Sequence, residues 1–93
     1  MFNKIASVHI AVPLRGPGNI IRQNPVSFDV FSEDNHYKAV PLLNEDERRV
    51  ANLPQELLFN YEKGRPVSQR GAWDGNFHAI QDIFDELQKQ NLL

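Results

Sequence analysis

The stretch NFHAIQDIFDELQKQ, residues 76–90, is the most strongly patterned part of this 93-residue chain and decides its fold class. Its apolar residues recur every three or four positions, as they do along one face of a helix. The pattern predicts an amphipathic helix that runs from Phe77 to the C-terminus, with Asp74 or Asn76 as its cap. Four side chains are expected to face inward: Phe77, Ile80, Phe84 and Leu87.

The N-terminal part of the chain alternates with a period of two, which indicates strands. Residues 4–14 place Ala6, Val8, Ile10, Val12 and Leu14 on one face, with Ile5 as the apolar exception on the other. The glycine-rich loop at residues 15–19 ends this strand. Residues 20 and 21 could begin a second strand, which Pro25 would interrupt because proline has no backbone donor.

A hairpin is expected next, with arms at residues 28–31 and 37–42 and a polar turn at residues 32–35. Its first strand has Val26, Phe28 and Val30 on one face, and its second has Val40 and Leu42 on one side. These five apolar side chains predict the face that the hairpin turns towards the core.

A short helix follows the hairpin. Asn44 and Glu47 have the spacing of a capping box, and Pro54 limits the helix to about two turns, ending near Asn52. Residues 55–63 fit either a helix or a strand, and the alternation of Leu57 and Phe59 favours a strand.

Together these elements predict a single α+β domain over residues 1–93, a three- to four-stranded, mostly antiparallel sheet. A long C-terminal helix packs on one face of this sheet, and the chain has one short helix. The expected core consists of Val8, Ile10, Val12, Phe28, Val30, Val40, Leu42, Phe59, Ile80, Phe84 and Leu87.

Composition excludes several classes of function. Ten basic and twelve acidic residues give a net charge of −2, which makes nucleic-acid binding unlikely for the domain as a whole. The chain has no cysteine and therefore neither disulfides nor thiolate metal sites. We expect a cytoplasmic protein that does not associate with membranes, since no apolar run is long enough to cross a bilayer.

The first candidate site is the segment at residues 65–76, expected to be a loop that leads into the last helix. Helix N-termini attract anions, and arginine and tryptophan could add charge and a flat surface. Asp74 could already occupy the place of the anion, and a capped loop with no ligand explains the segment better. The candidate ligand-binding residues are Arg65, Arg70, Gly71, Trp73 and Asn76.

Other candidates are weaker. Asp74, His78 and Asp82 lie four residues apart and could hold a metal, although a solvated helix face is the better explanation of these residues. Arg22 and the loop at residues 15–19 could bind a phosphate, although a simple turn is the better explanation. No metal, cofactor or catalytic residue is therefore expected, because no sequence spacing supports a nucleophile and base pair.

Association is the remaining candidate. Ile5, Phe31 and Tyr37 are expected on the second face of the sheet, where apolar residues would form a contact surface. The leading hypothesis is a small non-enzymatic binding or adaptor domain that self-associates as a homodimer or binds a protein partner. It would present a sheet face or residues 65–76. The alternative is a small-ligand or nucleotide-phosphate binding protein, with or without enzymatic activity, that uses residues 65–76 and the start of the last helix.

Overall fold

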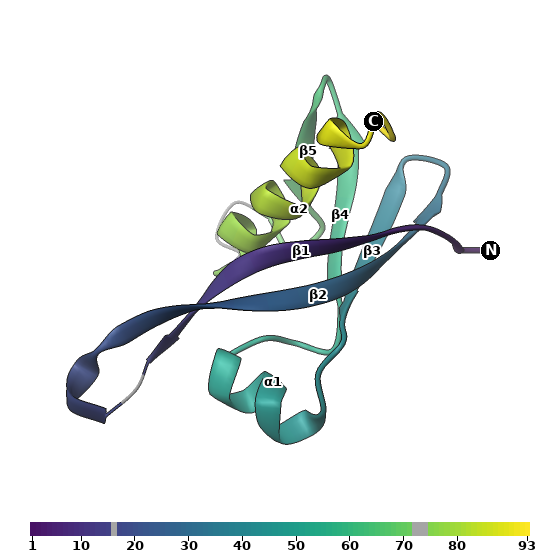
Figure 1. The fold of residues 1–93 in the computed structure, drawn as a ribbon. Helices are drawn as coiled ribbons and strands as arrows, with labels where there is room; N and C mark the ends of the chain where they lie inside the picture. The colour runs from purple at the N-terminus through teal and green to yellow at the C-terminus, as the bar shows by residue number, and fades with distance from the viewer. Residues whose placement is uncertain (16, 72–74) are drawn as a thin grey trace.

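The computed structural model describes residues 1–15, 17–71 and 75–93. Five strands and two α-helices make up the described chain, and Figure 1 shows their arrangement. In chain order the elements are β1 (Asn3–Arg15), a 3-10 helix (Pro17–Asn19), β2 (Ile21–Glu33), β3 (His36–Pro41), α1 (Glu45–Ala51), β4 (Leu57–Glu62), β5 (Arg65–Ser68) and α2 (Phe77–Lys89).

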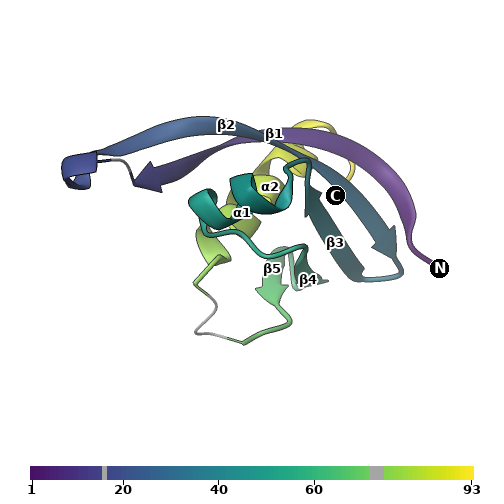
Figure 2. The same cartoon turned by 90° about the horizontal axis from the view of Figure 1, so that it is seen from below.

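The five strands form one antiparallel sheet in the order of the sequence, β1-β2-β3-β4-β5. The sheet is curled, and α2 contacts both of its edge strands, β1 and β5 (Figures 1 and 2). α1 follows β3 and lies beside β1. The fold is therefore α+β, as expected, but with more strands than the sequence pattern predicted.

Two segments account for the extra strand content. Arg65 to Ser68, which we expected to belong to a loop, pairs with β4 as β5. A tight turn makes this pairing possible, because Lys63 and Gly64 both adopt positive φ, at 53° and 81°. β2 also begins at Ile21 and continues through Pro25, so the expected interruption at that proline is wrong.

The two elements between β3 and β5 agree with expectation. Residues 57–62 form a strand, β4. α1 begins with the capping box, in which the Asn44 side chain accepts from the Glu47 N–H at 2.8 Å and the Glu47 carboxylate accepts from the Asn44 N–H at 2.9 Å. The helix ends before Pro54 is reached, because Asn52 adopts the left-handed conformation, with φ 55°.

The core lies between the curled sheet and α2. Its buried apolar residues are Val8, Ile10, Val12, Val26, Phe28, Val30, Tyr37, Ala39, Ala51, Leu53, Leu57, Phe59, Ile80, Ile83, Phe84 and Leu87. The stacked rings of Tyr37 and Phe59, whose centroids lie 5.3 Å apart, form its centre on β3 and β4.

The expected core face of β3 is wrong. Leu42 is 53% exposed and Val40 is half-buried, whereas Tyr37 and Ala39 are buried. The register explains the difference, because Ala39 lies opposite the buried Val30. Directly opposed residues share a face of the sheet, so the core side of β2 determines the core side of β3.

The C-terminal helix is shorter than predicted. α2 ends at Lys89, and Asn91 follows with φ 59°. The Leu92 N–H donates to the Leu87 carbonyl at 3.0 Å, as in the backbone motif that ends helices at a left-handed residue. Phe77 was expected to face inward but is 38% exposed, so the buried stripe begins one turn later, at Ile80.

Candidate functional site

β1 and β2 extend well beyond the rest of the sheet. β3 pairs with β2 from Glu33 back to Phe28, whereas the β1–β2 pairing continues to Arg15 and Ile21. We call residues 13–15 and 17–25 the arm. Figures 1 and 2 both show it projecting from the rest of the fold, consistent with principal extents of 43 × 25 × 23 Å.

Both edges of the arm carry a proline. The Ser27 carbonyl accepts from the Leu42 N–H at 2.9 Å, so Ser27 directs its backbone polar groups towards β3. Pro25 lies two residues earlier in the strand, so its backbone nitrogen faces the same edge of β2 as that of Ser27. Among the described strands, β3 does not extend far enough to pair with Pro25 at this edge. By the same alternation, Pro13 points to the outer edge of β1. Prolines at strand edges prevent further strands from adding, so the arm offers its faces rather than its edges to a partner.

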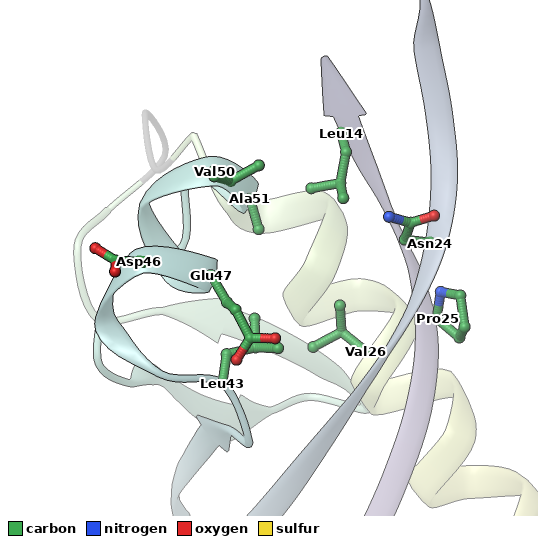
Figure 3. A pocket seen from close by; sticks show the side chains of 9 residues that line it. All are labelled: Leu14, Asn24, Pro25, Val26, Leu43, Asp46, Glu47, Val50 and Ala51. Atoms are coloured by element: carbon green, nitrogen blue, oxygen red, sulfur yellow. The ribbon is translucent and has the colours of Figure 1, made fainter. Parts of the chain in front are cut away.

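An apolar groove lies between the arm and α1, with a volume of about 360 Å³. Figure 3 shows its lining, to which the arm side, the segment before α1 and α1 itself all contribute. We call it the α1 groove. Its lining residues are Leu14, Asn24, Pro25, Val26, Leu43, Asp46, Glu47, Val50 and Ala51.

The surface around this groove exposes large apolar side chains. Val50 on α1 is 64% exposed, and Ile20 and Ile21 at the end of the arm are 57% and 58% exposed. A second hollow of about 510 Å³, lined by Pro13, Ile21, Val50, Ala51 and Asn52, adjoins the α1 groove. Because the two hollows share Val50 and Ala51, they form one continuous apolar surface.

Charge is distributed unevenly around this surface. Residues 5–28 contain no Asp or Glu but carry Arg15 and Arg22. The first turn of α1 carries the opposite charge, with Glu45, Asp46 and Glu47 in sequence. Arg49 pairs with the first two of these carboxylates at 3.8 and 3.7 Å, and with Arg48 it leaves α1 with a net charge of −1 (three carboxylates, two guanidiniums).

The outer face of the sheet differs from the surface that we expected. Ile5 lies at an irregularity in the β1–β2 register and packs against the core. Tyr37 is buried against Phe59, so of the three expected residues Phe31 alone fits the prediction. The ammonium of Lys38 lies over the rings of Phe31 and Phe2, at 5.2 and 4.8 Å.

Polar pairs occupy the neighbouring part of that face. The Ser7 hydroxyl donates to Asp29 at 2.8 Å, and Lys4 lies 3.2 Å from the same carboxylate. The hydrogen bond from Ser7, followed by the interaction with Lys4, lowers the pKa of Asp29 below its ordinary value. His9 Nδ1 and Ser27 Oγ lie 2.7 Å apart as directly opposed residues, so sheet pairing explains this contact without catalysis.

The ligand-binding residues predicted on residues 65–76 fall into two separate hollows. Arg70 and Asn76 line one of about 270 Å³, together with Glu56. Arg65 and Gly71 line another of about 350 Å³. Trp73, and the alternative cap Asp74, lie outside the described residues. Asn76 occupies the N-cap position of α2 without making the capping hydrogen bond through its side chain.

The metal hypothesis gains no support in the described part of the chain. His78 and Asp82 line one shallow hollow with residues of β1, and Asp74 is not described. Among residues 1–15, 17–71 and 75–93, no three His, Asp or Glu side chains come together as metal ligands would. Neither described helix has the length and apolar content that crossing a membrane would require.

Sequence reasoning missed the apolar surface of the arm and α1. One signal was present, since Ile20 and Ile21 directly precede Arg22 in a long stretch without carboxylates. Only the projection of the arm reveals that these isoleucines lie outside the core. No family model, curated protein or solved structure matches the chain, so its function has to be inferred from its own residues.

Proposed function

We propose that this chain is a small, non-enzymatic protein-interaction domain that associates with a second copy of itself through the arm and the α1 groove. The observation that carries the proposal is the exposure of Ile21 and Val50, which line the hollow that adjoins the α1 groove, and of Ile20 next to Ile21 in the chain. Contiguous apolar surface outside a core is typical of sites where proteins bind one another.

Two energetic considerations support this proposal. Full burial of one isoleucine or valine contributes about 1.5–3 kcal/mol, so three such side chains could drive a stable contact. In addition, a two-stranded ribbon alone is only marginally stable in water. If a partner packed against the projecting arm, its exposed apolar side chains would be buried and the two-stranded ribbon would be stabilised.

The outer sheet face and residues 65–76 are less suited to this role than we first expected. Asp29 and Ser27 already bind groups on the neighbouring strand. Arg65 belongs to the short edge strand β5, next to Pro66, and strands of this kind discourage pairing with another chain. The arm therefore replaces both surfaces as the proposed contact.

The mass of the chain in solution tests the proposal. We expect light scattering to show a mass that rises with concentration from 10.7 kDa towards twice that value. The double variant Ile20→Ser/Ile21→Ser should remain a monomer. Leu42→Ser is the matched control, because Leu42 is similarly exposed, at 53%, but lines neither the α1 groove nor the adjoining hollow.

Two results would contradict the proposal. One is a wild-type chain that stays monomeric at millimolar concentration. The other is a dimer that the Leu42 control disrupts and the isoleucine double variant leaves intact, because that result would place the contact on the outer sheet face.

A second candidate function is the binding of a small phosphate-bearing ligand. Its support is that Arg70 and Asn76 line the same hollow at the start of α2, where the helix dipole favours an anion. Glu56 weakens this candidate, because an acidic residue in the lining disfavours an anion. Thermal unfolding with nucleotides and with inorganic phosphate tests it: a rise in melting temperature that Arg70→Ala abolishes would support ligand binding.

A further inference from the structure

We infer that the association is reciprocal: the arm of each copy lies in the α1 groove of the other, with Ile20 and Ile21 against its apolar lining and Arg22 facing Asp46. This inference rests on the proposed function and adds the geometry of the contact. It identifies the occupant of the groove as the end of an arm from a second copy of this chain.

The chemistry of the arm matches that of the groove. The end of the arm combines two exposed isoleucines with arginines and has no carboxylate nearby in sequence. The groove combines apolar side chains, among them Leu14, Leu43 and Val50, with carboxylates at its rim. Asp46 is 88% exposed, so an incoming guanidinium can approach it.

Arg49 is the existing partner of Asp46 and competes weakly for it. The two groups lie 3.7 Å apart on the helix surface and are both largely exposed. Exposed ion pairs of this kind contribute little stability. Arg22 can therefore join the cluster, since the three carboxylates of α1 outnumber its two arginines, Arg48 and Arg49.

The edges of the arm argue against the main alternative geometry, in which two sheets join through their edge strands. Pro13 and Pro25 remove donors from the two outer edges of the arm, as the alternation from Ser27 indicates. Contact through side chains on the faces of the arm remains available. Docking into a groove uses these faces and needs no further strand pairing.

The contact can be reciprocal because each copy carries both an arm and an α1 groove. In a two-fold dimer, residue i of one copy contacts residue j of the other, and j contacts i. The arm and the groove adjoin each other (Figure 3), so two copies that face each other could exchange arms and form both contacts. A one-way contact would instead continue from copy to copy as a filament.

Two charge-reversal variants test the inference, Arg22→Glu and Asp46→Arg. In a dimer of either variant alone, both arm-to-groove contacts bring like charges together, and we expect at least tenfold weaker association. In an equimolar mixture of the two, one contact joins the new glutamate at position 22 to the new arginine at position 46. The other contact joins the unchanged Arg22 of one variant to the unchanged Asp46 of the other. The mixture should therefore regain a one-to-one dimer, detected by native mass spectrometry after one variant is isotopically labelled.

Matched controls separate charge pairing from misfolding. Lys63→Glu removes an exposed basic side chain in the β4–β5 turn, far along the chain from the arm, and should leave association unchanged. A chain with both reversals should dimerise on its own. In samples dilute enough to be monomeric, all variants should melt within roughly a few degrees of the wild type, because Arg22 and Asp46 are exposed.

The outcomes distinguish failure of this geometry from failure of the proposed function. If the wild-type chain dimerises but the mixture of variants forms no heterodimer, arm exchange is wrong and self-association stands. A mass that grows without limit overturns reciprocity. A monomeric wild type overturns both. Binding of a short DNA duplex that Arg22→Glu abolishes and Asp46→Arg leaves intact would assign the arm to nucleic acid instead of a second copy.

Discussion

The two ends of the β1–β2 ribbon differ in what covers them. Near Val8 and Phe28, the ribbon packs against α2, and these side chains are almost fully buried. Beyond Val12 and Val26 the same two strands continue in register, but Arg22 and Asn24 are exposed. We call the covered part of the fold the body. The comparison with the arm teaches that strand pairing and burial are separable, and that the uncovered part of a strand is where binding can take place.

The largest contrast should appear in stability. Phe59→Ala removes a fully buried ring from the body, where it stacks on Tyr37. We expect the free energy of unfolding to fall by about 3–5 kcal/mol, measured by urea denaturation of dilute protein. Ile21→Ser in the arm should change it by less than about 0.5 kcal/mol. Similar losses for the two variants would mean that the arm belongs to the core.

A smaller effect is expected at the boundary between the two regions. Asn44→Ala removes the capping box of α1, which forms one wall of the groove. The loss of a helix cap typically costs about 1 kcal/mol. Glu45→Ala is the control, because it removes only an exposed ion pair and should cost a few tenths of that amount. Equal effects in urea denaturation would indicate that the cap does not hold this wall.

A pH dependence should belong to the body alone. Burial raises the pKa of Tyr37, and the nearby Tyr61 adds to the shift. The folded state therefore disfavours the phenolate, so the free energy of unfolding should fall as the pH rises above about 10, the ordinary tyrosine value. In Tyr37→Phe, the free energy of unfolding should fall less at alkaline pH, and only the decrease caused by other groups should remain. An unchanged alkaline profile in Tyr37→Phe would contradict the assigned cause.

The smallest effect concerns the outer sheet face. The Ser7 hydroxyl is the main cause of the lowered pKa of Asp29. Ser7→Ala should raise this pKa towards 3.8, as followed by NMR titration of the carboxyl carbon. A lowered carboxyl pKa stabilises the fold above the unfolded value, and that stability is lost as the pH falls through the folded one. Ser32→Ala, on the same strand as Asp29, should not change the titration.

Local patterns predicted the elements that depend on local interactions. The α2 stripe, the Asn44 capping box and the strand at residues 57–62 follow from residues close together in sequence. The core face of β3 could not be predicted from nearby residues in this way. Tyr37 and Ala39 alternate with Lys38 and Val40, so neither side of the strand is clearly the apolar one. Only the pairing of β3 with β2 decides between the two faces.

Pro25 and Arg65 were misjudged for the same physical reason. A proline interrupts a strand only where its missing donor would face a neighbour, and Pro25 faces an open edge. Residues 65–68 are too short to show a pattern of their own, and they become a strand because the turn at Lys63 and Gly64 returns them to β4. Both outcomes depend on the neighbouring strand, which the local sequence does not specify.

The candidate site was less predictable than the fold. Ile20 and Ile21 have the same residue types as a buried strand, so their composition does not reveal that they are exposed. Arg70 and Asn76 line one hollow, while Arg65 lies in a different one because β5 formed. Exposure is a property of the whole arrangement and could not be derived from these stretches alone.

Amide hydrogen exchange at low and high protein concentration tests the central claim most directly, because it reports on the arm and the body in one sample. We predict that protection in residues 20–24 rises with concentration as the arm docks, while protection in residues 57–60 of β4 stays constant. Arm amides whose exchange rate does not change between concentrations at which the chain is monomeric and concentrations at which it is dimeric would contradict the account.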